Sequence, residues 1–143
     1  MQISEIDQEI SDFDWFAIDC NGYVVHFSSG GNQLPHSVAA SKESLDLLQH
    51  YFLSLPILFS KTEIFVAPTN TPFPYLAYAR RGLFSYEAIQ YAWPMHTSYE
   101  LTARPLRALA LANLPAEIAE LVSKTQLGFS IIGLVSLDTE MVA

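Results

Sequence analysis

The chain has 143 residues, of which 50% are hydrophobic and only 15% are charged, so it is globular rather than disordered and long enough for a hydrophobic core. Its formal net charge of −8 opposes binding to nucleic acid and to anionic membranes, because both attract Lys and Arg. Cys20 is the single cysteine, no signal-peptide pattern is present and no apolar run reaches the ~20 residues of a membrane span, so we expect one cytoplasmic domain over residues 1–143.

The N-terminal third predicts a helix followed by a β-hairpin. Three isoleucines recur at helical spacing within residues 2–12, which indicates a short amphipathic helix with its acids toward solvent: Ile3, Ile6 and Ile10. Residues 13–19 and 23–28 are rich in β-forming side chains and flank Asn21-Gly22. This pair tolerates the positive φ angles of a type I′ turn, so we expect two antiparallel strands joined by it.

Two further helices and several strands fill the rest of the chain. A helix over residues 41–53 begins at Ser41, whose hydroxyl can cap it, and another over residues 114–125 has Pro115 in its first turn. Strands are expected at residues 63–67, 75–80, 83–86, 99–104 and 129–134, with a proline-rich connector at 68–74. The order predicts an α+β fold, a mostly antiparallel sheet of about five to six strands with the two main helices packed on one face.

The charge distribution is the first candidate for function. Six acidic residues precede Lys42, the first basic residue of the chain: Glu5, Asp7, Glu9, Asp12, Asp14 and Asp19. Like charges repel one another, so this set stays unneutralised unless distant arginines or a partner approach it. We expect it to bind a basic protein partner, although acidity that serves solubility alone explains the same pattern.

A second candidate is the segment that contains Arg80, Arg81 and Tyr86. Successive strand residues point to opposite faces, so one arginine faces solvent and the other a protein carboxylate. An internal ion pair with Asp14 or Asp19 is one interpretation, and recognition of an anion in a pocket beside Tyr86 is the other.

No pattern predicts a catalytic residue, a metal or a cofactor. The chain contains no G-x-S-x-G elbow, and the glycine-rich residues 28–31 lack the Lys of a phosphate loop. Its four histidines are scattered, and Asp12, Asp14 and Asp19 lack the spacing of a calcium loop. Three glutamates are candidates for acid–base chemistry, but no spacing selects them: Glu63, Glu87 and Glu100.

Three short motifs resemble those of small acidic bacterial proteins, some of which are similar to the immunity proteins of polymorphic toxins. The resemblance is carried by W-F-x-x-D-x-x-G-x-x-x-x-F-x-S-x-G at residues 15–31, by Leu34-Pro35, and by R-G-L-F-x-Y at residues 81–86. It implies an inhibitor that binds a toxin and carries no catalytic residues.

Three functional hypotheses follow. The first is a non-catalytic cytoplasmic binding protein, an immunity-type inhibitor of a basic toxin, which uses the acidic N-terminal residues. The second is a small-molecule-binding domain or minor enzyme with its pocket near Arg80, Arg81 and Tyr86. The third is a structural subunit whose surplus of apolar surface forms a homo-oligomer.

Overall fold

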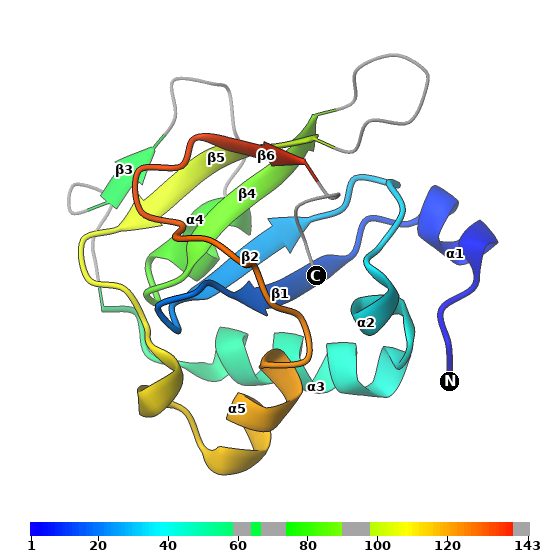
Figure 1. Ribbon diagram of the computed structural model, residues 1–143, viewed down its shortest axis with the longest axis horizontal. Coiled ribbons are helices and arrows are strands. Elements are labelled where there is room, and N and C mark those ends of the chain that lie inside the picture. The colour runs from blue at the N-terminus through cyan, green and yellow to red at the C-terminus, as the bar shows by residue number, and fades with distance from the viewer. Residues whose placement is uncertain (59–63, 67–73, 90–97, 139–143) are drawn as a thin grey trace.

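The computed structural model describes residues 1–58, 64–66, 74–89 and 98–138, and shows an α+β fold with a mixed sheet (Figure 1). The strands are β1 (Asp14–Ile18), β2 (Val24–Ser28), β3 (Ile64–Val66), β4 (Phe84–Ile89), β5 (Ser98–Pro105) and β6 (Ser136–Asp138). Their order is β1-β2-β4-β5-β3, and β6 also pairs with β5. Among the described strands β2 and β4 run parallel and the other pairings are antiparallel, so the expected antiparallel character is largely confirmed.

The structure describes five helices, and the expectation of two main helices packed on one face of the sheet is not confirmed. They are α1 (Glu5–Ile10), α2 (His36–Ala39), α3 (Lys42–Ser54), α4 (Pro74–Ala79) and α5 (Ala116–Val122). Helices α3 and α5 contact each other and β1, whereas α4 packs against β4 and β5 (Figure 1). The predicted α3 is confirmed to within a residue, and its Ser41 hydroxyl accepts a hydrogen bond from the backbone N–H of Ser44. Such N-caps stabilise a helix by roughly 1 kcal/mol.

The β1–β2 hairpin is confirmed, but its turn is longer than expected. Asp19 and Tyr23 still pair, because the N–H of Asp19 donates to the carbonyl of Tyr23, and three residues, 20–22, form the loop. The N–H of Gly22 donates to the carbonyl of Asp19, and Gly22 has a φ of +82°. A three-residue loop with a left-handed glycine at its end replaces the type I′ turn that Asn21-Gly22 suggested.

One face of the sheet carries four buried aromatic side chains from four different strands: Trp15, Phe27, Tyr86 and Tyr99. The Trp15 and Phe27 rings stack with their centroids 4.1 Å apart, and Tyr99 meets Phe27 edge-on at 5.1 Å. The C-terminal segment crosses this face (Figure 1), where the carbonyl of Leu134 accepts the Tyr86 hydroxyl proton. Residues 129–134 therefore cover the sheet and do not form the expected last strand, which is β6 at 136–138.

The segment expected as a strand at 75–80 is the short helix α4. Two hydrogen bonds end it, from the N–H of Gly82 to the carbonyl of Ala79 and from the N–H of Leu83 to that of Tyr78. With Gly82 at a φ of +100°, these bonds form a Schellman C-cap, so Arg81-Gly82 ends a helix instead of joining two strands. Leu76 and Ala79 pack against Ala103 of β5. The register shift opposite Ser85 and Tyr86 turns Ala103 toward α4 and away from the face of Tyr99 and Leu101.

Candidate functional site

The most exposed acidic element is α1, the helix that we expected at residues 2–12. Only one of its side chains, Gln8, is buried. The Gln8 amide donates to the carbonyl of Ile3 and accepts from the N–H of Leu34, so it fixes the helix to the rest of the protein. Ile3 is buried as expected, but Ile6 and Ile10 are 70% and 74% exposed.

We define the α1 face as the exposed residues of this helix: Glu5, Ile6, Asp7, Glu9 and Ile10. Residues four apart on a helix are neighbours, so Ile6 and Ile10 form an apolar pair among three carboxylates. The helix that the spacing of the isoleucines predicts is present, but two of the three side chains point to solvent instead of into the core. The α1 face therefore presents a small apolar patch rimmed by carboxylates, and an apolar patch with a polar rim is the arrangement of interaction surfaces.

Asp19 does not belong to the acidic surface, because its side chain is 3% exposed. One carboxylate oxygen accepts the backbone N–H groups of Asn21 and Tyr23, each at 2.9 Å, and the other accepts that of Ile131, also at 2.9 Å. Its partners are backbone donors and not the arginines that we considered. Asp19 holds the hairpin loop to the C-terminal segment, and we leave it out of the candidate surface.

Asp12 and Asp14 are also engaged internally. One Asp12 oxygen accepts from the Ser28 hydroxyl at 2.8 Å and from the N–H of Gly30 at 2.9 Å, although the residue itself is exposed. Asp14 is partly buried and accepts from His26, Gln49 and Tyr78, which lie on β2, α3 and α4. Asp14 therefore connects the sheet to two helices. Of the six acids, Asp14 and Asp19 are withdrawn from the surface, Asp12 is exposed but hydrogen-bonded to Ser28 and Gly30, and the three acids of α1 are exposed.

Ser85, His26 and Asp14 form a hydrogen-bonded series that is reminiscent of a hydrolytic triad. The Nε2 atom of His26 is 2.7 Å from Asp14, and its Nδ1 atom is 2.9 Å from the Ser85 hydroxyl. A carboxylate only accepts, so Nε2 donates to Asp14, while Nδ1 shares its hydrogen bond with the Ser85 hydroxyl. His26 and Ser85 are both 0% exposed, and the Tyr78 ring stacks on the imidazole at 3.8 Å. A substrate cannot reach this serine in the observed structure, so the series is a buried polar network that orders the core.

The structure does not bring Arg81 and Tyr86 together. The Arg81 guanidinium donates to the backbone carbonyls of Leu55 and Ala77, at 2.8 and 2.7 Å. The Tyr86 hydroxyl donates to Leu134 on the aromatic face, and burial raises the pKa of this hydroxyl. Arg80 is partly exposed and makes interactions of its own. The anion pocket near these residues stays a prediction, and neither of the two cavities described next is lined by them.

The register of β4 and β5 brings two candidate acid–base residues together, which their separation in the sequence could not reveal. Glu87 lies directly opposite Glu100, with Glu87 partly buried and Glu100 exposed. Like charges opposite one another in a sheet are unfavourable. No cavity described here is lined by the pair, and Glu63, the third candidate, lies outside the described residues.

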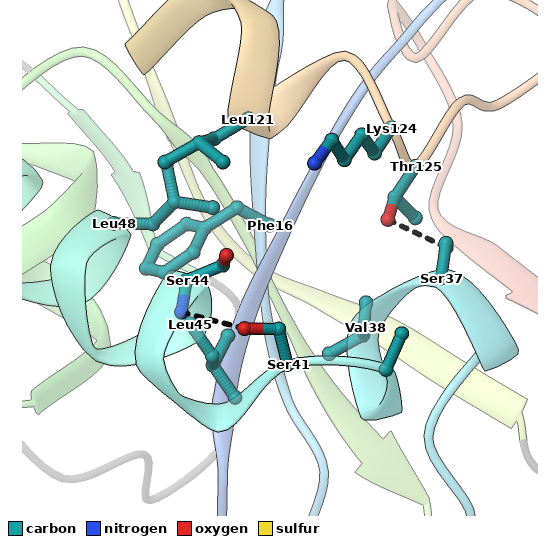
Figure 2. A pocket seen from close by; sticks show the side chains of 11 residues that line it. Phe16, Ser37, Val38, Ser41, Ser44, Leu45, Leu48, Leu121, Lys124 and Thr125 are labelled. Atoms are coloured by element: carbon teal, nitrogen blue, oxygen red, sulfur yellow. Dashed lines mark hydrogen bonds between the residues drawn. The ribbon is translucent and has the colours of Figure 1, made fainter. Parts of the chain in front are cut away.

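A small cavity lies among α2, α3, α5 and β1 (Figure 2). Its volume is about 70 Å³, with an apolar lining that includes Phe16 and Leu45. Ser37 and Thr125 share a hydrogen bond of 2.7 Å at its border, and Lys124 lies beside them (Figure 2). Sites for small molecules have volumes of roughly 300–1,000 Å³, so this cavity is too small for a metabolite.

A larger, open groove lies beside the start of α1. Its volume is about 390 Å³, and it is lined by residues 2–5 and by Gln8, Gln33, Leu34, His36 and Ala39. We call it the N-terminal groove. Its polar lining includes Glu5, the amides of Gln2 and Gln33, and the His36 imidazole. Because Glu5 also belongs to the α1 face, the groove and the face form one continuous surface.

Within residues 1–58, 64–66, 74–89 and 98–138, no three His, Cys, Asp or Glu side chains are arranged to hold a metal ion. No helix in those same ranges is long and apolar enough to cross a bilayer.

The chain matches no protein-family model, no curated protein and no solved structure. The similarity to immunity proteins therefore stays a prediction from short motifs.

Proposed function

We propose that this protein is a non-catalytic binding protein whose α1 face docks on a basic protein partner, as an immunity-type inhibitor of a cationic toxin in the cytoplasm would do. The observation that carries the proposal is the exposure of Ile6 and Ile10 on a helix that also exposes Glu5, Asp7 and Glu9. An interface of this kind has an apolar centre and a polar rim.

The apolar pair supplies the attraction at short range. Full burial of an isoleucine side chain contributes roughly 1.5–3 kcal/mol, and most of this is still available because Ile6 and Ile10 are 70% and 74% exposed. A partner that covers both side chains gains that contribution without opening the core of this protein.

The carboxylates supply charge complementarity. Two nearby cations are engaged by acids outside α1. The N-terminal ammonium of Met1 pairs with Glu43, and the Lys42 ammonium lies 2.9 Å from Asp46, which together with neighbouring acids raises the pKa of Lys42. Lys42 is therefore committed mainly to Asp46 on its own helix. Because the chain has a formal net charge of −8, it attracts a basic partner before contact, which raises the association rate more than the final affinity.

The N-terminal groove gives the partner a place to insert a side chain. Its volume of about 390 Å³ exceeds that of any single amino-acid side chain, and the Glu5 carboxylate lies in its lining. A lysine or arginine of the partner fits this chemistry, because its charge can pair with Glu5 while amide oxygens accept hydrogen bonds from its other N–H groups.

The test compares two double variants that remove equal charge from different helices. The product of the neighbouring gene is the first partner to examine, by calorimetry against the full chain. Asp7→Asn/Glu9→Gln removes two carboxylates from the α1 face, and Glu117→Gln/Glu120→Gln removes two exposed carboxylates from α5. We expect the α1 variant to bind about tenfold more weakly, which corresponds to about 1.4 kcal/mol, and the α5 variant to bind as the parent does.

Equal binding by the two variants contradicts the α1 face as the docking surface. Binding that shows no dependence on salt contradicts the electrostatic argument, because rim charges are screened within about 10 Å at 0.1 M salt. No saturable binding at all contradicts the immunity-type function with this partner.

A further inference from the structure

A second surface of the chain has the composition that the α1 face requires of a partner. The end of β5 and the first residues after it read Arg104-Pro105-Leu106-Arg107, which we call the 104–107 loop. Leu106 is 74% exposed, and both arginines are exposed. An exposed apolar side chain between two cations is the chemical complement of Ile6 and Ile10 among acids.

The two surfaces lie at opposite ends of the molecule. Helix α1, in blue, is at one end of the long axis, and the yellow loop after β5 is at the other (Figure 1). They therefore cannot meet within one copy in this fold. Two copies can bring them together if the loop of one copy docks on the helix of the next.

We propose that the α1 face of one copy binds the 104–107 loop of a second copy, head to tail. Such a contact is heterologous, so the assembled pair still presents one acidic end and one basic end, and further copies can add as a chain or a closed ring. The inference shares the α1 face with the proposed function, and a basic partner therefore competes with a second copy for that face.

The contact is weak. A six-residue helix against a four-residue loop buries far less than the about 1,200 Å² of stable interfaces. The net charge of −8 on each copy also opposes association. The copies separate on dilution, which leaves the α1 face open for a tighter partner.

The experiment uses complementary variants in sedimentation equilibrium of the full chain. Asp7→Lys/Glu9→Lys reverses the charge of the α1 face and leaves the 104–107 loop unchanged. Leu106→Ser/Arg107→Glu removes the apolar side chain and one positive charge from the loop and leaves the α1 face unchanged. We expect the mass of the parent protein to rise with concentration beyond that of a dimer, and each variant alone to stay monomeric. An equimolar mixture of the two variants should form dimers and nothing larger, because each variant retains one complementary end.

A parent protein that stays monomeric up to millimolar concentration overturns the inference, as does continued self-association of either variant or a mixture that remains monomeric. A measurement on the parent alone covers the case in which a variant fails to fold. The amide chemical shifts of the parent protein should change with concentration at residues 5–10 and 104–107. Concentration-dependent changes confined to other residues contradict the contact. A monomeric parent that still loses partner affinity through Asp7→Asn/Glu9→Gln refutes only the self-contact, so the two proposals fail separately.

Discussion

Substitution of Asp19 separates a structural carboxylate from a binding one. Its side chain is 3% exposed and accepts three backbone N–H groups, those of Asn21, Tyr23 and Ile131, at 2.9 Å each. In Asp19→Asn one oxygen becomes an NH₂ group. Even in the better of the two amide orientations, this group faces the N–H of Ile131, and two donors then oppose each other.

The cost of Asp19→Asn can be derived from these contacts. Hydrogen bonds to charged groups contribute about 1.5–3 kcal/mol, and an unpaired buried donor costs about 1–3 kcal/mol. These two energies are not additive, because both describe the same lost hydrogen bond at Ile131. We therefore expect Asp19→Asn to lower the free energy of unfolding by about 2–4 kcal/mol, and Asp19→Ala to lower it further because all three donors lose their acceptor.

Urea denaturation measures this loss. With a slope of about 2 kcal/mol per molar urea, within the typical range for small proteins, the midpoint of Asp19→Asn should fall by roughly 1–2 M. Glu9→Gln is the matched control, because Glu9 is exposed and surface substitutions change stability by about 0.5 kcal/mol or less. If Asp19→Asn unfolds at the midpoint of the parent protein and weakens partner binding instead, the structural role of Asp19 is refuted.

Two further predictions concern ionisation and backbone conformation. Burial raises the pKa of three tyrosines above the ordinary value of about 10, with the Asp14 carboxylate adding to the effect at the first of them: Tyr78, Tyr86 and Tyr99. The folded protein then holds protons that the unfolded chain releases, so stability is complete below about pH 10 and falls above it by about 1.4 kcal/mol per pH unit per tyrosine. Phenolate absorbance of the folded protein checks this, and ionisation of every tyrosine together near pH 10 would contradict it. Gly82→Ala should destabilise by at least about 1 kcal/mol in thermal melts, because φ is +100° and the new Cβ lies 3.1 Å from that of Leu109. Gly128→Ala, whose Cβ meets nothing within 4 Å, is the control, and equal melting of the two variants would refute the argument.

Local chemistry was enough to predict several elements. Ser41 caps α3 because its hydroxyl needs only the N–H of Ser44, three residues on, and the β1–β2 hairpin forms because its two β-rich segments are joined by a loop that ends in Gly22. These interactions lie within a few residues along the chain. Short-range patterns therefore carry the information that specifies them.

The candidate site depended on contacts that no local pattern contains. Six acids in the first 19 residues look alike in sequence, yet Asp19 is held by Ile131, 112 residues away, and Asp14 by His26, Gln49 and Tyr78. The same is true of Ile6 and Ile10, whose spacing predicts a helix but not which of its sides meets the core.

The sequence by itself therefore determined the composition, the net charge, the hairpin and the capped helix α3, because turn and cap hydrogen bonds are satisfied by near neighbours. The tertiary structure alone decided that residues 74–79 form a helix that packs on Ala103, and that Asp14 and Asp19 are engaged inside the fold whereas the acids of α1 are exposed. The physical reason is that burial and the satisfaction of polar groups depend on which distant segments pack together.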